Sequence, residues 1–162
     1  MRNDNLATYL NDHLAGSVAA IEMIEHLIKI YEGTPIEQFC KKLCADINSD
    51  QTELRGLMRS LEIKESSARK AGAWVAEKFS RPKLGRGSEG TEEVGFLQAL
   101  EGLVLGIRGK EGLWRALGEV KKSWLELQQF DLERLEKRAI EQGERVEAKR
   151  LEVARKILVQ LS

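Results

Sequence analysis

The chain contains little of what interrupts helices or cross-links small domains. Only 2 of its 162 residues are proline, and only 2 are cysteine. Few prolines leave room for long helices, because proline is the strongest helix breaker. Two cysteines exclude a scaffold held together by several disulfides. No apolar run reaches the ~20 residues of a membrane-spanning helix, and the formal net charge of +0 excludes an overall field that attracts nucleic acid or membranes.

The residues that are present are typical of a water-soluble helical domain. Charged residues make up 32% of the chain and apolar residues 42%, and the length suits a single domain, 1–162, with a sizeable core. The first residues, MRNDNLATYLNDH, include no apolar signal core, which predicts a cytoplasmic protein. Cys40 and Cys44 lie one helical turn apart, where disulfide geometry is poor, so we interpret them as reduced core thiols.

Apolar residues spaced three and four apart predict a first helix over about residues 5–31. Gly33 ends this helix, and Thr34 is the expected N-cap of the next one. Pro35 fits the first helical position, and Glu37 completes a capping box with Thr34. The second helix therefore starts almost at once and is expected to run back along the first as an antiparallel hairpin.

A second hairpin is predicted after a long middle segment. Thr91 is the expected N-cap of a third helix that runs to about residue 120, and the stretch KKSWLELQQF holds the following turn. Asp131 is the expected N-cap of a fourth helix that reaches about residue 161. The segment 63–91 can make a short helix around Trp74 and is long enough to cross the length of a bundle, with Trp74 packed against it.

Four strings carry a resemblance to a known group of proteins: YLNDHLAGS at 9–17, KAGAWVAEK at 70–78, LGIRGKEGLWRAL at 105–117 and RAIEQGERVEAKRLEVAR at 138–155. With these strings the chain resembles, over nearly its full length, uncharacterised bacterial ferritin-like proteins. The resemblance implies an all-α, ferritin-like four-helix bundle of two helical hairpins joined by a long crossover with a short extra helix. It implies no particular activity, substrate or cofactor.

One side of the third helix carries small residues at steps of four and three: Gly95, Ala99, Gly102, Gly106 and Gly109. Each interior glycine costs about 1 kcal/mol of helix propensity relative to alanine. Close approach of a neighbouring helix would compensate for this cost. We therefore expect Gly102 and Gly106 to face such a neighbour, which is another helix of the bundle, the crossover segment or a second subunit.

Di-iron proteins of the ferritin-like class carry a Glu-x-x-His pair on each of two helices. The matching segments here, DQTE at 50–53 and EQGERVE at 141–147, contain no histidine, which argues against ferroxidase or oxygenase chemistry. A reduced site for iron, manganese or zinc remains a hypothesis. Its candidate ligands are His13, Asp50, Glu53 and Glu147.

A polar layer inside the bundle is the simpler interpretation of the same residues. His13 lies on the apolar line of the first helix, and Asp50 lies between Ile47 and Leu54 on that of the second. Because a buried charge needs a partner, we expect His13 and Asp50 to lie close together in a layer that fixes helix register. The predicted members of this layer are His13, Asp50, Gln51, Arg108 and Gln142.

Two hypotheses about function remain open. The first is a non-catalytic bundle, monomeric or homodimeric, that acts through an interaction surface or an interhelical pocket on an unknown protein or small ligand. The second is a metal-handling or redox protein with a degenerate di-metal site. The chain contains no P-loop, dinucleotide-binding glycine pattern, zinc spacing or nucleophile elbow, and no nucleic-acid partner is expected. The charges of the fourth helix are expected to pair within it, as in Glu141 with Arg145.

Overall fold

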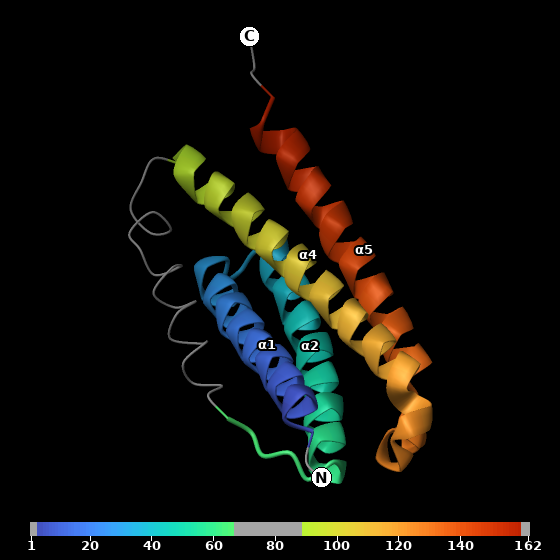
Figure 1. Cartoon of the computed structure of the whole chain (residues 1–162). Helices are drawn as coiled ribbons and strands as arrows, with labels where there is room; N and C mark the ends of the chain where they lie inside the picture. Colours follow the sequence, from blue (N-terminus) through green and yellow to red (C-terminus); the bar gives the residue numbers. More distant parts are fainter. Residues whose placement is uncertain (1–2, 67–88, 160–162) are drawn as a thin grey trace.

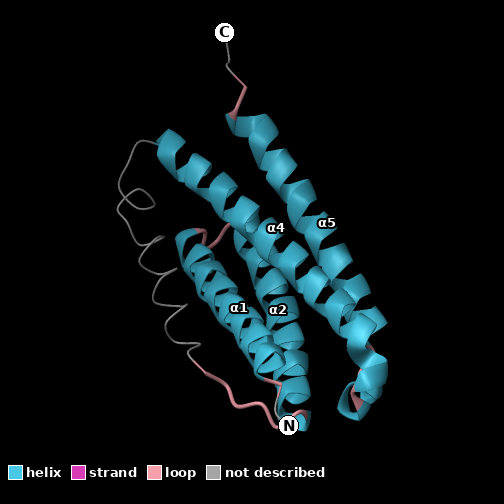
Figure 2. Ribbon diagram, viewed as in Figure 1, coloured by secondary structure: helices cyan, strands magenta, loops and turns pink. Residues whose placement is uncertain are grey.

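The computed structural model describes residues 3–66 and 89–159, and long helices account for most of them (Figure 1, Figure 2). The α-helices are α1 (Asp4–Ile30), α2 (Pro35–Ser60), α4 (Glu89–Val120) and α5 (Leu132–Ile157), and two short 3₁₀ helices, η2 (Lys121–Ser123) and η3 (Leu125–Gln129), precede α5. These ranges contain no strand, which confirms the predicted all-α class for the described residues. Within the same ranges, no helix combines the length and apolarity needed to cross a bilayer.

Local signals in the sequence set the turn of the first hairpin. Gly33 takes a φ of +79°, a conformation that glycine adopts without steric cost. Glu37 Oε2 accepts a hydrogen bond from the Gly33 N–H at 2.8 Å, and Thr34 Oγ1 donates to the Tyr31 carbonyl at 2.6 Å. The Thr34 side chain makes no capping bond to α2, so the predicted capping box is wrong. Glu37 reaches back one residue further than expected because the Thr34 N–H is already bonded to Tyr31.

The second hairpin turns through η2 and η3, within the stretch that was predicted to hold the turn. The Asp131 side chain accepts from the Arg134 N–H at 3.0 Å, which confirms Asp131 as the N-cap of α5. Lys121 Nζ donates to the Phe130 carbonyl at 2.7 Å and so ties the two ends of the turn together.

The start of α4 differs from the prediction. The helix begins at Glu89, two residues before Thr91, so Thr91 is not its N-cap. Acidic residues generally favour a helix N-terminus, because of the positive end of the helix dipole, and the sequence offers them at 89, 92 and 93. The sequence alone therefore does not fix the residue at which α4 begins.

The bundle consists of two antiparallel hairpins that lie face to face. α1 packs along α2, and α4 packs along α5 (Figure 1). α2 ends at the end of the bundle where α1 begins, whereas α4 begins at the opposite end, so α2 and α4 run in the same direction. The predicted crossover helix around Trp74 falls in 67–88 and lies outside the described residues.

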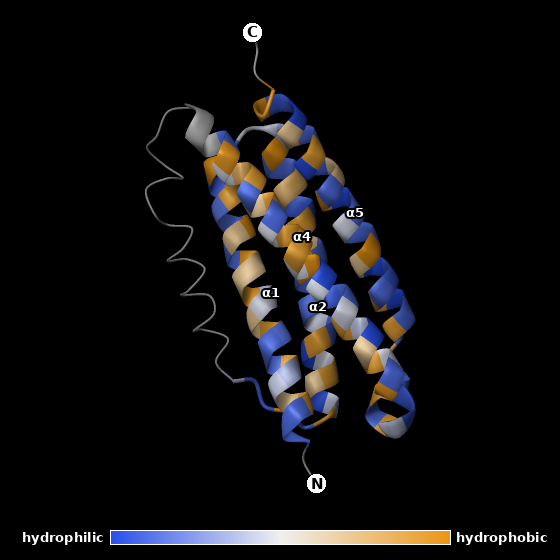
Figure 3. Cartoon of the chain, turned by 45° about the horizontal axis from the view of Figure 1, so that its top comes forward, coloured by the Kyte–Doolittle hydropathy of each residue, from blue (hydrophilic) through white to orange (hydrophobic). Residues whose placement is uncertain are grey.

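The apolar core is divided into two clusters along the bundle. One includes Ile24 of α1 and Leu100 of α4, and the other surrounds Leu57 of α2 and Trp114 of α4. Figure 3 shows hydrophobic and hydrophilic residues alternating along each helix, as expected of helices that bury one face. Each fully buried leucine or isoleucine contributes about 1.5–3 kcal/mol relative to exposure, so these clusters supply most of the driving force for folding.

The two cysteines belong to this core. Cys40 is buried, Cys44 is half-buried, and both are free, which confirms their interpretation as reduced thiols. Burial raises the pKa of the Cys40 thiol to about 11 and raises the pKa of Cys44 as well. Both side chains therefore stay protonated near neutral pH, where only a thiolate would be nucleophilic.

A row of three ion pairs joins α2 to α5, with a pair at the buried Asp50 between two partly exposed pairs. The pairs run in antiparallel order: Arg134–Glu53 at 3.0 Å, Arg138–Asp50 at 3.0 Å and Arg145–Asp46 at 2.5 Å. The predicted pairing of Arg145 with Glu141 is wrong, because the α2 carboxylate of Asp46 lies within reach of the guanidinium. The two partly exposed pairs contribute roughly 0–1 kcal/mol each, so they chiefly fix how the two hairpins face each other.

Candidate functional site

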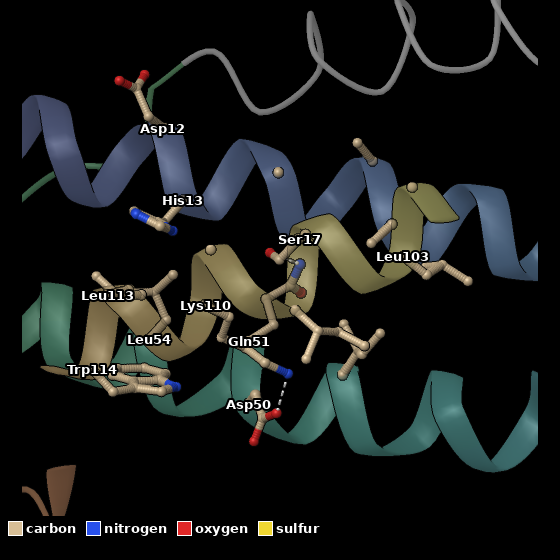
Figure 4. Close-up of a pocket in the computed structure, with 18 of the residues that line it drawn as sticks. Asp12, His13, Ser17, Asp50, Gln51, Leu54, Leu103, Lys110, Leu113 and Trp114 are labelled. Carbon is tan, nitrogen blue, oxygen red and sulfur yellow. Dashed lines mark hydrogen bonds and ion pairs between the residues drawn. The ribbon is translucent and has the colours of Figure 1, made fainter. Parts of the chain in front are cut away.

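A groove of about 560 Å³ lies between α1 and α4, with α2 as its floor. Its walls are mostly apolar or small, as with Ala20 of α1 and Leu103 of α4, while Ile47 and Leu54 of α2 line the floor. Figure 4 shows side chains from all three helices converging on this space. Sites for small molecules typically measure roughly 300–1,000 Å³ and are largely apolar, so the groove has the size and character of such a site.

Glycines keep the groove open. Gly102, Gly106 and Gly109 of α4 line it, together with Gly16 of α1. A Cβ atom placed at any of these four positions would meet no atom within 4 Å in the described part of the chain. The prediction that Gly102 and Gly106 face a close helix of the same bundle is therefore wrong, because α1 stands away from α4 at this level. Contact with the crossover segment or a second subunit stays a prediction.

The close approach of two helices occurs on the other side of α4. A Cβ atom added to Gly143 of α5 would lie 3.4 Å from Cγ2 of Ile107 and 3.8 Å from Cζ of Arg108. Gly143 of α5, and not the glycine line of α4, is thus where a side chain would come into van der Waals contact with the neighbouring helix of the hairpin.

Five polar side chains from all four helices lie at one level, between the two apolar clusters. Along α2, for example, Asp50 separates Ile47 of one cluster from Leu54 of the other. The members of this polar layer are Ser17 of α1, Asp50 and Gln51 of α2, Lys110 of α4 and Gln142 of α5. The layer crosses the bundle beneath the middle of the groove, which Ser17, Asp50, Gln51 and Lys110 also line.

Asp50 is the centre of the polar layer. Its side chain is 2% exposed, and Oδ2 accepts hydrogen bonds from Lys110 Nζ at 2.6 Å and from Gln142 Nε2 at 2.8 Å. Lys110 Nζ also donates to Gln142 Oε1. The three side chains therefore bond to one another in a closed set, which offsets the cost of burying their polar atoms.

The charge of Asp50 is compensated from two sides. Lys110 approaches from α4, and Arg138 Nη2 of α5 lies 3.0 Å from Oδ1. The direction of the Arg138 contact gives no hydrogen bond, so Oδ1 has no hydrogen-bond partner among the described residues. Burial lowers the pKa of the Lys110 ammonium, and the charge of Asp50 opposes this shift.

A second set of hydrogen bonds joins α1 to α2 in the same layer. Gln51 Nε2 donates to Ser17 Oγ at 2.9 Å, and Ser17 Oγ donates to the Leu14 carbonyl at 2.7 Å. Arg55 Nη1 donates to Gln51 Oε1 at 2.7 Å. These hydrogen bonds hold the Gln51 side chain in place. The part of the groove that Ser17 and Gln51 line is therefore preorganised.

The structure brings some of the predicted layer together and places the rest elsewhere. Asp50 and Gln142 bond directly, but His13 lies on the α1 wall, across the groove from Asp50 (Figure 4). The His13 ring is half-buried and meets the Tyr9 ring edge-on at 4.7 Å between centroids, and burial lowers its pKa. Arg108 is absent from the layer because it pairs with Glu111 at 2.9 Å on the outer face of α4.

The four candidate metal ligands are not gathered into one site. Glu53 pairs with Arg134, and Glu147 pairs with Arg150 at 2.7 Å, a contact that lowers the pKa of Glu147. Over residues 3–66 and 89–159, no group of three or more histidine, cysteine, aspartate or glutamate side chains is placed to share a metal ion.

Two residues of the site were missed by reasoning from the sequence, namely Lys110 and Trp114. Both lie on the core-facing line of α4 that runs through Leu103, Ile107 and Leu117 at steps of four and three. That spacing is the signal that could have found them. Trp114 is 1% exposed and lines the groove, and its Nε1 has no hydrogen-bond partner in the described part of the chain.

No protein-family profile, curated protein or solved structure matches this chain, so the resemblance to ferritin-like proteins stays a prediction and function has to be inferred from the groove and the polar layer.

Proposed function

We propose that this protein is a non-catalytic bundle that binds a small, largely apolar molecule in the groove between α1 and α4. The observation that carries this proposal is the groove of about 560 Å³, open at four glycines and floored by apolar side chains of α2. Its volume lies in the range of known small-molecule sites.

The glycine pattern supports a site that has to stay open. Each of Gly102, Gly106 and Gly109 lies inside α4, where alanine would favour the helix by about 1 kcal/mol. No close packing within the described bundle compensates for this loss. An unfilled apolar groove adds a second cost, because its lining atoms lack contacts on one side. A bound apolar molecule would offset both costs in the functional state.

The depth of the groove favours a small ligand over a flat protein surface. Ile47, Asp50 and Leu54 of α2 line it, although all three are almost fully buried in the bundle. A molecule that contacts them has to enter between α1 and α4, beyond the outer surface of either helix. Protein interfaces are usually shallower, with an apolar centre and a polar rim.

We also propose that the bundle has the ferritin-like connectivity. The parallel course of α2 and α4 (Figure 1) supports this, because a simple up-down-up-down bundle would make these two helices antiparallel. An experimental structure with α2 and α4 antiparallel would contradict it.

The groove can be tested with a neutral apolar fluorophore, N-phenyl-1-naphthylamine, titrated into the full-length protein. We expect saturable binding at one site per chain. Gly106→Leu fills the groove with a side chain and should weaken binding by about tenfold or more, comparable to losing one buried aliphatic contact. Gly112→Leu is the matched control, because Gly112 lies on the same helix, makes no contact within 4 Å and does not line the groove.

Equal effects of the two substitutions would show that the fluorophore binds somewhere else. Absence of saturable binding to the wild-type protein would refute the proposed function. Far-ultraviolet circular dichroism of each variant verifies that the helices are intact.

A further inference from the structure

We infer that His13 makes ligand binding in the groove depend on pH: an apolar molecule binds while the imidazole is neutral and leaves when the imidazole takes up a proton. This inference rests on the proposed function and adds the regulation of the same groove.

His13 lies where a ligand in the groove has to touch it. The residue lines the groove from α1, and Figure 4 shows its ring between that helix and the Leu113 side chain of α4. The ring is half-buried, so part of its surface remains open to solvent. In the described chain it meets the edge of the Tyr9 ring and the charge of Asp12, and neither ring nitrogen makes a hydrogen bond there.

A ligand that fills the groove removes water from the open part of the ring. The neutral imidazole loses less by this change than the imidazolium, because moving a charged group out of water is far more costly than moving a neutral one. An apolar ligand therefore binds the neutral form more tightly. By linkage, binding also lowers the pKa of His13, and the change in proton affinity equals the change in ligand affinity.

The ring already shows the first part of this effect in the open groove. Burial lowers the pKa of His13 below its ordinary value of 6.5, and the charge of Asp12 opposes this shift without cancelling it. Histidine is the side chain whose ordinary pKa lies closest to neutral. A further loss of water on ligand binding continues the same shift, so the groove changes its affinity at mildly acidic pH.

The other charged groups around the groove do not replace His13 in this role. Three charged residues line it, namely Asp12 of α1, Asp50 of α2 and Lys110 of α4, and no described residue of α5 does so. Asp12 is exposed, and Figure 4 shows its carboxylate on the side of α1 away from the groove. Asp50 and Lys110 bond to each other at 2.6 Å and so compensate each other's charge.

The test measures the affinity of N-phenyl-1-naphthylamine for the full-length protein by fluorescence, from about pH 8 to about pH 5, a range in which the probe stays neutral and histidine titrates. We expect the wild-type affinity to fall about fivefold over this range, which corresponds to a His13 pKa roughly one unit lower in the complex. His13→Gln keeps a polar side chain that takes up no proton, so its affinity should change by less than about twofold.

His26→Gln is the matched control. His26 is the other of the 2 histidines in the chain, lies exposed on the same helix and does not line the groove, so this variant should keep the wild-type pH dependence. Its ¹H NMR spectrum contains the imidazole signals of His13 alone, which give the pKa of His13 in the free protein, expected below 6.5. Affinity should begin to fall at that pH, and this comparison decides the matter even if His13→Gln fails to fold. Far-ultraviolet circular dichroism at each pH verifies that the helices are intact.

The two proposals fail in different ways. Saturable binding with the same affinity at every pH would overturn the role of His13 and leave groove binding intact. An affinity that rises as the pH falls would also overturn it, as would a fall that persists in His13→Gln, because another group would then carry the pH dependence. Absence of saturable binding to the wild-type protein at every pH would refute the groove as a ligand site, and this inference with it.

Discussion

The buried bond between Lys110 and Asp50 makes the sharpest prediction about stability. Lys110→Met keeps an unbranched side chain of similar length and removes the ammonium that lies 2.6 Å from Asp50 Oδ2. The aspartate stays 2% exposed with Gln142 and Arg138 as its remaining neighbours. Removing one partner of a buried ion pair costs roughly 3–5 kcal/mol. Because Arg138 Nη2 lies 3.0 Å from the other oxygen and still compensates part of the charge, we expect about 3 kcal/mol.

A double-mutant cycle separates this charge effect from lost packing. Asp50→Asn removes the carboxylate charge and keeps the shape of the side chain. Once Lys110 is methionine, the additional cost of Asp50→Asn should be much smaller, because no uncompensated charge is left inside. We expect the double variant to be more stable than the sum of the single effects predicts, with a coupling of roughly 1–3 kcal/mol.

Urea denaturation followed by far-ultraviolet circular dichroism measures these differences, on a total unfolding free energy that is roughly 5–15 kcal/mol for a domain. Lys156→Met is the matched control. Its side chain is 69% exposed, so the change should stay within about 0.5 kcal/mol. A loss below about 1 kcal/mol for Lys110→Met, or additive effects in the cycle, would refute the view that this pair is an essential buried interaction.

The structure also predicts how substitutions of Gly106, Cys40 and His13 change the unfolding free energy. Gly106→Ala should raise the unfolding free energy by up to ~1 kcal/mol, because alanine favours the helix and its Cβ meets no described atom within 4 Å; a lower urea midpoint than wild type would contradict an open groove. The folded-state pKa of Cys40 is about 11, above its ordinary value of 9.0. Between these pH values the folded state binds more protons than the unfolded state. The stabilising contribution of the thiol is therefore lost as pH rises from about 9 to about 11. The difference in unfolding free energy between wild type and Cys40→Ala should therefore shrink by about 2 kcal/mol from near pH 8 to near pH 11. His13→Ala should cost only about 1 kcal/mol, the value of its edge contact with Tyr9, and should leave the iron, manganese and zinc bound per chain unchanged; stoichiometric metal in wild type that disappears in this variant would establish the metal hypothesis.

Helix boundaries were predictable wherever the signal was local and specific. Gly33, Pro35 and Asp131 mark ends that the structure reproduces, because a cap or a left-handed turn involves atoms only a few residues apart. Thr91 failed as a cap because several acidic residues there favour a helix start equally well. The sequence by itself therefore determined four long helices, the turn between α1 and α2 and the turn between α4 and α5.

The sequence also placed Asp50 on a buried helix face, since its spacing from Ile47 and Leu54 reveals the face. It could not decide which cation reaches Asp50. Arg108 and Lys110 lie about 200° apart around α4, so the rotation of this helix puts Lys110 inside and leaves Arg108 with Glu111 on the outer face.

Only the tertiary structure decided that the glycine line of α4 borders a groove. A stripe of small residues permits close packing and equally permits an open space, and the spacing between α1 and α4 selects one of them. That spacing results from the packing of all four helices at once, including the polar layer and the α2–α5 ion pairs. The same packing leaves Trp114 Nε1 and Asp50 Oδ1 buried without a hydrogen-bond partner among the described residues, because their surroundings are built from residues far apart in the sequence.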